Sequence, residues 1–179
     1  NDYSSQTLMP RLMNHLQQCA PNLRLQIMHC PMVDRDDINQ RLSDDELDLA
    51  VAVFDRPPLM DQCCLLYEDP LVVVMDRSHP LYGQQNNQKN SVEAFASYPQ
   101  VAVSMRENEP QLINALLASL GLERRVLLTT PYVSTLPRIL QGSELIAVVP
   151  QKAAELMNEH PWMRFQPLPL QVQPFSVCL

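Results

Sequence analysis

The sequence predicts an α/β fold, and three observations point to that class. The chain has 179 residues with 46% hydrophobic content, enough to bury a core in one domain or in two small lobes. Segments with helical spacing of apolar residues alternate along the chain with short apolar runs typical of strands. Helices between successive strands act as crossovers, so mostly parallel sheets covered on both faces are expected.

The first expected element is a helix over residues 4–19. Leucines recur there every four positions, which places them on one face of a helix. The three are Leu8, Leu12 and Leu16. Ser4 or Ser5 is positioned to cap its amino end, because a serine hydroxyl accepts a hydrogen bond from a free backbone N–H there.

The other elements follow from the same two periodicities. Strands are expected where apolar residues alternate or run together, at residues 23–28, 47–53, 63–67, 71–75, 100–104, 125–130, 145–149, 164–170 and 175–179. Helices are expected at residues 34–43, 92–96, 111–120 and 133–140. Gly121 and Gly142 follow the last two helices, where glycine favours the left-handed conformation that ends a helix.

Composition excludes several classes of function. The net charge of −7 argues against a nucleic-acid surface on this chain, because phosphate binding needs clustered Lys and Arg. Three glycines are too few for a phosphate-binding loop or a nucleophile elbow. The four histidines lack metal-ligand spacing. The sequence therefore predicts no enzyme, no metal and no cofactor.

The five cysteines favour a reducing compartment. They are odd in number and lack the CxxC spacing of zinc or redox motifs. Cys63 and Cys64 are adjacent on an expected strand, so their side chains point to opposite faces. A core cysteine beside a surface cysteine is favoured over a redox switch. With no signal peptide and no apolar run of about 18 residues, a cytoplasmic protein without membrane contact is expected.

Several segments follow one another along the chain in a characteristic order. They are Leu8-Met9-Pro10-Arg11-Leu12, Ala20-Pro21-Asn22-Leu23-Arg24-Leu25, Leu42 to Ala50, Asp69-Pro70-Leu71-Val72-Val73-Val74 with His79-Pro80-Leu81, Gly121 to Val126, and Gly142 to Pro150. Together they resemble one bacterial family, the effector-binding domain of LysR-type transcriptional regulators. Arg124-Arg125-Val126 and Thr130-Pro131-Tyr132 are most similar to the branch of nodulation and aromatic-degradation regulators.

The resemblance implies two Rossmann-like lobes of the periplasmic-binding-protein type 2. The first lobe is expected at residues 1–70 and 150–179, and the second at residues 71–149. The two crossovers are expected near residues 69–75 and 148–151. The family's winged helix-turn-helix domain lies outside this sequence, so the resemblance implies DNA contact through that domain alone.

Candidate effector contacts lie where strands end and helices begin, since ligands bind at the carboxyl ends of strands in open α/β sheets. They are Ser4, Ser5, Arg35 and Phe54 in the first lobe, and Ser104, Met105, Thr130, Tyr132 and Val133 in the second. Simpler roles compete with this one. The serines can be helix caps, the aromatic residues can be packing residues, and Arg35 lies among aspartates that can pair with it.

Two helices carry wider apolar faces than a core contact needs. The residues expected in a dimer interface are Leu8, Leu12, Leu16, Leu112 and Leu116. The family resemblance implies that these helices pair between subunits of a homodimer, or of a tetramer in the full-length protein. The alternative is that both faces belong to the core.

Two functions remain open at this stage. The first is a sensor that binds a small molecule, aromatic or carboxylate, between its lobes and passes a change of conformation to DNA-binding domains. The second is an extracytoplasmic solute-binding protein of similar two-lobed fold. An upstream helix-turn-helix or an upstream signal peptide distinguishes them.

Overall fold

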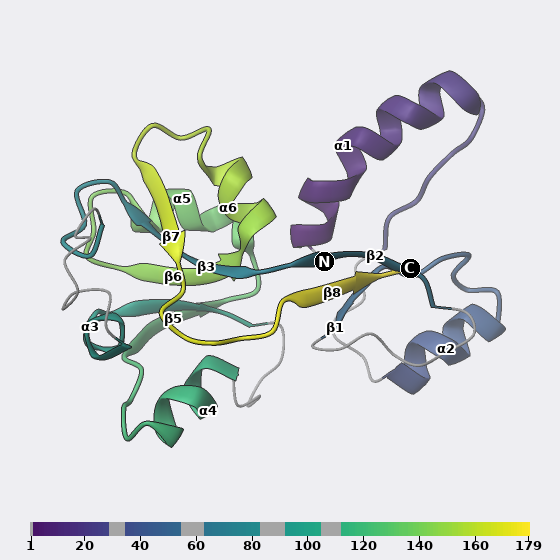
Figure 1. Cartoon of the computed structure of the whole chain (residues 1–179). Helices are drawn as coiled ribbons and strands as arrows, with labels where there is room; N and C mark the ends of the chain where they lie inside the picture. Colours follow the sequence, from purple (N-terminus) through teal and green to yellow (C-terminus); the bar gives the residue numbers. More distant parts are fainter. Residues whose placement is uncertain (1, 29–34, 55–62, 83–91, 105–111) are drawn as a thin grey trace. The chain divides into compact units, whose positions relative to one another are not determined.

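A computed structural model describes residues 2–28, 35–54, 63–82, 92–104 and 112–179 of the chain (Figure 1). The chain forms two compact units. Unit 1 comprises residues 1–68 and 175–179, and unit 2 comprises residues 69–174. The chain therefore enters unit 2 after Glu68 and returns to unit 1 at Phe175.

The boundaries of the units differ in part from the expected lobes. The first boundary lies within two residues of its expected position. Residues 150–174 were expected in the first lobe, and that expectation is wrong because they belong to unit 2. The reason is the pairing of β7 (Met163–Pro167) with β3 (Leu71–Asp76), which fixes this segment to the sheet of unit 2. The second crossover is accordingly at residues 174–175 rather than 148–151.

Unit 1 contains two helices and a three-stranded sheet. The helices are α1 (Asp2–Cys19) and α2 (Arg35–Ser43), and the strand order is β1 (Ala52–Phe54), β8 (Phe175–Cys178), β2 (Leu65–Asp69). β8 runs antiparallel to β1, with Ala52 opposite Cys178. The central strand is the segment that returns from unit 2 to unit 1.

Unit 2 contains a five-stranded sheet in the order β5-β4-β6-β3-β7. Its other strands are β4 (Gln100–Val103), β5 (Val126–Thr130) and β6 (Ile146–Pro150). β4 is parallel to β5 and β6, whereas β3 is antiparallel to β6 and β7. Four strands thus share one direction, as expected of an α/β fold. β3, which enters unit 2 directly after β2 and Pro70, runs opposite to them.

Helices cover both faces of this sheet (Figure 1). One face carries α3 (Val92–Ser97) and α4 (Leu112–Ser119). The other carries α5 (Leu136–Leu140), which follows the 3-10 turn η1 (Val133–Thr135), and α6 (Gln151–Met157). Gly121 and Gly142 both have positive φ, 72° and 66°, as the helix-ending role requires. Covered on both sides, the sheet buries apolar side chains on both its faces.

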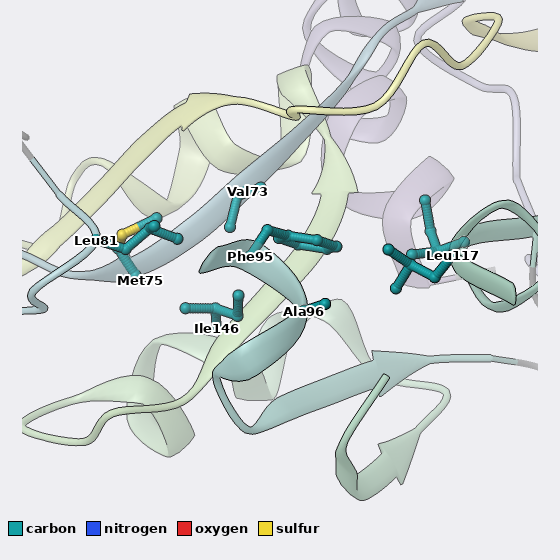
Figure 2. Close-up of a cluster of buried hydrophobic side chains, with 8 residues drawn as sticks. Val73, Met75, Leu81, Phe95, Ala96, Leu117 and Ile146 are labelled. Atoms are coloured by element: carbon teal, nitrogen blue, oxygen red, sulfur yellow. The ribbon is translucent and has the colours of Figure 1, made fainter. Parts of the chain in front are cut away.

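The core on one face of the sheet centres on Phe95 (Figure 2). Its ring is fully buried among Val73 and Met75 of β3, Ile146 of β6 and Leu117 of α4. Burying a side chain of this size contributes roughly 1.5–3 kcal/mol relative to leaving it in water. This cluster fixes α3 and α4 to β3 and β6 of the five-stranded sheet.

Helix α6 is an element that the sequence did not reveal. Its N-cap, Pro150, makes no side-chain capping bond. Instead the buried carboxylate of Asp69 accepts hydrogen bonds from the Lys152 backbone N–H at 3.2 and 3.3 Å. The Pro70 carbonyl accepts the Gln151 N–H at 2.8 Å. Since the cap is more than 80 residues away in the chain, no local signal marks the start of this helix.

The strand expected at residues 23–28 is absent from the described part of the chain. The segment alternates as predicted, but it belongs to no strand, and Leu23, Leu25 and Ile27 are all exposed. The strand expected at residues 47–53 shrinks to β1. Side-chain alternation is only one requirement of a strand, which also needs a neighbouring ladder of hydrogen bonds.

Two buried polar side chains stabilise the end of β3. The Asp76 carboxylate accepts bonds from the Ser78 N–H at 2.8 Å, the Ser78 hydroxyl at 2.7 Å and the Gly142 N–H at 2.8 Å. Burial raises the pKa of Asp76, but these bonds and the charge of Arg77 outweigh burial and leave its pKa below 3.8. The bond to Gly142 joins β3 to the turn after α5.

His79, in the turn that follows β3, makes a second connection to the segment after α5. Its Nδ1 accepts the Leu81 N–H at 3.0 Å, so Nε2 carries the proton and donates to the Glu144 carbonyl at 3.1 Å. Burial is the largest influence on its pKa and lowers it below 6.5, although the Glu144 carbonyl and the charges of Glu144 and Asp76 partly oppose this. Protonation at Nδ1 would also abolish the bond from Leu81.

We therefore expect His79 to make stability depend on pH. The pKa of His79 is lower in the folded chain than in the unfolded chain. The contribution of His79 to the unfolding free energy is therefore complete above pH 6.5 and is lost as the pH falls through the pKa of the folded state. His79→Asn should cost about 1–3 kcal/mol, because the Glu144 carbonyl loses its donor. The unfolding free energy of this variant, measured in urea, should also change less between about pH 7 and about pH 5 than that of the wild type.

The matched control is His15→Asn, because His15 is exposed on α1. This control should keep both the stability and the pH slope of the wild type. Equal pH slopes for wild type and His79→Asn would contradict the role assigned to His79.

Candidate functional site

Polar side chains gather at the carboxyl ends of two parallel strands of unit 2. Val103 at the end of β4 is opposite Thr130 at the end of β5. The next residue, Ser104, donates its backbone N–H to the Thr130 carbonyl at 3.1 Å. The Thr130 hydroxyl in turn accepts the Tyr132 N–H at 3.2 Å. The structure thus brings together three of the residues selected from the sequence: Ser104, Thr130 and Tyr132.

Tyr132 and Val133 differ in what they can offer a ligand. Tyr132 is 55% exposed, and its carbonyl accepts the Thr135 hydroxyl at 2.8 Å, which fixes its backbone at the start of η1. Val133 is buried, so its side chain is a core residue and only its backbone remains available to a ligand. The usable groups at this edge are therefore hydroxyls, an aromatic ring and backbone N–H groups.

In unit 1 the first turn of α1 carries the second set of candidates. Ser4 is buried there, and Ser5 is half-buried. The turn is fixed to β2 by Tyr67, whose hydroxyl lies 3.3 Å from the Tyr3 hydroxyl and 3.3 Å from the Thr7 hydroxyl. The sequence did not single out Tyr67, because nothing local indicates that β2 passes the amino end of α1.

Three predicted site residues lack described side chains. Met105 lies outside the described residues altogether. The backbone of Arg35 begins α2 and that of Phe54 ends β1, but the side chains of both are outside the described part. Their roles stay predictions.

Within unit 2, the described groups with displaced pKa values lie away from this edge. Gln100, the first residue of β4, accepts the Arg124 Nε–H at 2.6 Å and donates to the Phe95 carbonyl at 2.9 Å. Burial lowers the pKa of the Arg124 guanidinium to about 10. This buried bridge is at the amino end of β4, opposite to Ser104, so it serves the fold. Over the described ranges, no group of three or more His, Cys, Asp or Glu gathers as metal ligands.

The helices expected to form a dimer interface present leucines outward. Leu12 and Leu112 are exposed, while Leu8, Leu16 and Leu116 are half-buried. On α4 the core contacts are made by Ile113 and Leu117 instead. The apolar residues of α4 are therefore divided between a core face and an outward face.

The described part of the chain is an α/β fold of two units, with hydroxyls at the carboxyl ends of two parallel strands of unit 2. Comparison with known families identifies the family. Residues 2–179 match the family model described as the LysR substrate binding domain, so the chain belongs to this family of transcriptional regulators, which are not enzymes.

The chain is similar to nodulation protein D of Rhizobium leguminosarum bv. trifolii, at 28% identity over 174 residues. The alignment covers 96% of this chain and 50% of that protein, so the chain spans about half the length of the curated relatives it matches. This similarity agrees with the resemblance of the sequence to the branch of nodulation and aromatic-degradation regulators. No helix in the described ranges is long and apolar enough to cross a membrane.

Solved structures share the fold. A probable transcriptional regulator of Pseudomonas aeruginosa superposes with a TM-score of 0.82 at 26% identity, covering 99% of this chain and 57% of that one. The CcmR regulatory domain of Synechocystis in complex with 2-PG gives 0.68 at 18% identity, covering 98% and 83%. The effector binding domain of QuiR in complex with shikimate gives 0.60 at 14%, covering 96% and 79%. The predicted two-lobed, periplasmic-binding-protein-like α/β class is confirmed.

Proposed function

We propose that this chain is the part of a LysR-type regulator that binds a small-molecule effector and forms a homodimer. The observation that carries the proposal is the group of Ser104, Thr130 and Tyr132 at the strand ends of unit 2. Regulatory domains of the same fold are known in complex with 2-PG and with shikimate. The family match disfavours the alternative of an extracytoplasmic solute-binding protein.

The chemistry of these residues favours a small aromatic or carboxylate effector. A hydroxyl and a backbone N–H both donate hydrogen bonds, which a carboxylate or phenolate oxygen accepts. The exposed ring of Tyr132 offers an apolar face for stacking. Ser4, Ser5, Arg35, Phe54, Met105 and Val133 stay proposed contacts, and we add Tyr67 because its hydroxyl adjoins the first turn of α1.

In the whole regulator, effector binding and DNA binding would be coupled through one conformational equilibrium. An effector that binds one conformation better than another shifts the population toward it, by no more than the difference in its affinities. The shift would reach DNA through a winged helix-turn-helix domain outside these 179 residues, in the cytoplasm. This division of labour agrees with the net charge of −7, which suits a sensor better than a DNA-contacting surface.

The first prediction concerns effector binding. A thermal-shift screen of aromatic acids, amino acids and dicarboxylates should yield a compound that raises the melting temperature, because a ligand of the folded state stabilises it by mass action. Thr130→Ala should then weaken binding roughly 10- to 150-fold in calorimetry, as expected for one lost hydrogen bond to a charged group. Thr130→Ser should restore most of the affinity, because it keeps the hydroxyl.

Thr129→Ala is the matched control, because Thr129 is on the same strand with its side chain on the opposite face. It should leave affinity unchanged. A compound whose affinity survives both Thr130→Ala and Tyr132→Ala would show that these residues do not form the effector site.

The homodimer rests on the outward leucines of α1 and α4. Exposed apolar residues that continue along a helix mark protein contacts, and a symmetric dimer uses the same patch of both subunits. The five proposed contact residues are Leu8, Leu12, Leu16, Leu112 and Leu116. In the full-length protein the same contacts would serve a dimer or a tetramer.

We expect sedimentation to detect the dimer at tens of micromolar. Leu12→Asp or Leu112→Asp should give a monomer, because each would bury an unpaired carboxylate in the interface. Leu156→Asp is the control, since Leu156 is a similarly exposed leucine on α6. A wild-type chain that sediments only as a monomer, or a Leu12→Asp variant that stays dimeric, would contradict this interface.

A further inference from the structure

Two cysteines that are far apart in the sequence meet at the end of the sheet in unit 1. Cys63 and Cys64 immediately precede β2, and Cys178 is the last residue of β8. Cys64 donates its N–H to the Leu179 carbonyl at 2.7 Å, and Leu179 donates back to the Cys64 carbonyl at 2.9 Å. Such a mutual exchange is the hydrogen-bonded pair of an antiparallel ladder.

This register decides which thiols face each other. With Cys64 opposite Leu179, Cys178 is opposite Leu65, and Cys63 is its diagonal neighbour on the same face. Cys64 points to the other face. Cys178 is buried, Cys63 is half-buried and Cys64 is exposed.

The thiols of Cys63 and Cys178 interact directly. Burial raises the pKa of the Cys178 thiol to about 11, and a hydrogen bond with the Cys63 thiol adds to the rise, as do the charges of Cys63 and Cys64. Cys178 therefore stays protonated at neutral pH and is shielded from solvent. Of the two, Cys63 is the thiol that a dissolved oxidant meets first.

We propose that Cys63 and Cys178 form a redox-active dithiol, which a hydroperoxide converts to a disulfide in two steps. In the first, the Cys63 thiolate attacks the O–O bond of the peroxide, which breaks. The sulfur gives up two electrons and gains an S–OH group, and the remaining oxygen leaves as hydroxide, or as alkoxide for an organic peroxide, and takes up a proton.

In the second step the Cys178 sulfur attacks the Cys63 sulfur. The S–S bond forms, the S–O bond breaks, and the hydroxyl leaves as water with the Cys178 proton. A diagonal pair requires a small backbone adjustment to reach disulfide geometry. Both cysteines are at strand ends, where such an adjustment disturbs the fewest ladder bonds.

The position of the pair gives the disulfide a consequence for the fold. β2 carries the chain out of unit 1 at residues 68–69, and β8 carries it back at residues 174–175. A bond between Cys63 and Cys178 thus joins the two strands just outside both crossings and encloses all of unit 2 in one covalent loop. Oxidation would covalently link β2 and β8, the two strands at which the chain leaves and re-enters unit 1.

The test is peptide mapping of the purified 179-residue chain after hydrogen peroxide. Remaining free thiols are alkylated, the chain is digested without reduction, and linked peptides are identified by mass spectrometry. We expect a Cys63–Cys178 linked peptide that disappears after dithiothreitol. The oxidised chain should also unfold at higher urea than the reduced chain, because the long loop restricts the unfolded state.

Cys64→Ser is the matched control and should still form the linked peptide, whereas Cys63→Ser should not. Cys178→Ala, which keeps the buried site apolar, should leave Cys63 as a sulfenic acid that dimedone traps. The proposal is overturned if both thiols are fully alkylated after peroxide, or if Cys63 is found joined to Cys64, to Cys19 or to a second chain instead.

Discussion

The organisation of unit 2 depends on β3, a strand that is buried on both faces, bonded along both edges and tied at both ends. Its apolar residues from Val72 to Met75 are at most 5% exposed, so helices must cover each face. β6 and β7 satisfy its backbone groups on the two edges. Two buried aspartates adjoin its ends: Asp69 accepts the N–H of Lys152 at the start of α6, and Asp76 accepts that of Gly142 after α5. Each carboxylate thus holds a helix end that is far away in the chain.

This fixed centre positions the candidate edge of unit 2, whose described residues Ser104, Thr130 and Tyr132 carry uncharged polar groups. With β6 bonded to β3, the parallel strands β4 and β5 extend the sheet on one side and end together at Ser104 and Thr130. The buried charge of this part of the sheet, Arg124 with Gln100, lies at the opposite ends of the strands. Ligand recognition by hydroxyls and backbone N–H groups carries a smaller desolvation cost than recognition by a buried cation. It would suit the proposed effector, which must bind and leave reversibly.

Local patterns predicted most of unit 2, but not the features that depend on distant partners. The helices ended by Gly121 and Gly142, the buried strand β3 and the positions of Ser104 and Thr130 at strand ends all followed from short-range signals. Helix α6 did not, because its capping carboxylate is Asp69. The same limit applied to Tyr67, to the alternating segment at residues 23–28 and to the contact of Cys63 with Cys178. Each depends on which strands are neighbours, and the periodicity of a single segment carries no such information.

Under the two proposals, the effector and the oxidant both act on β2 of unit 1. Cys63 comes just before β2, and Tyr67 lies four residues further on, where its hydroxyl contacts Tyr3 and Thr7 around the turn that carries Ser4 and Ser5. A backbone adjustment that closes the disulfide at the start of β2 would therefore change the support of this turn. Coupling between two sites is reciprocal, so an effector that orders the turn must change the reduction potential of the thiol pair in the matching direction. One short strand would then report both the small molecule and the oxidant to the rest of the regulator.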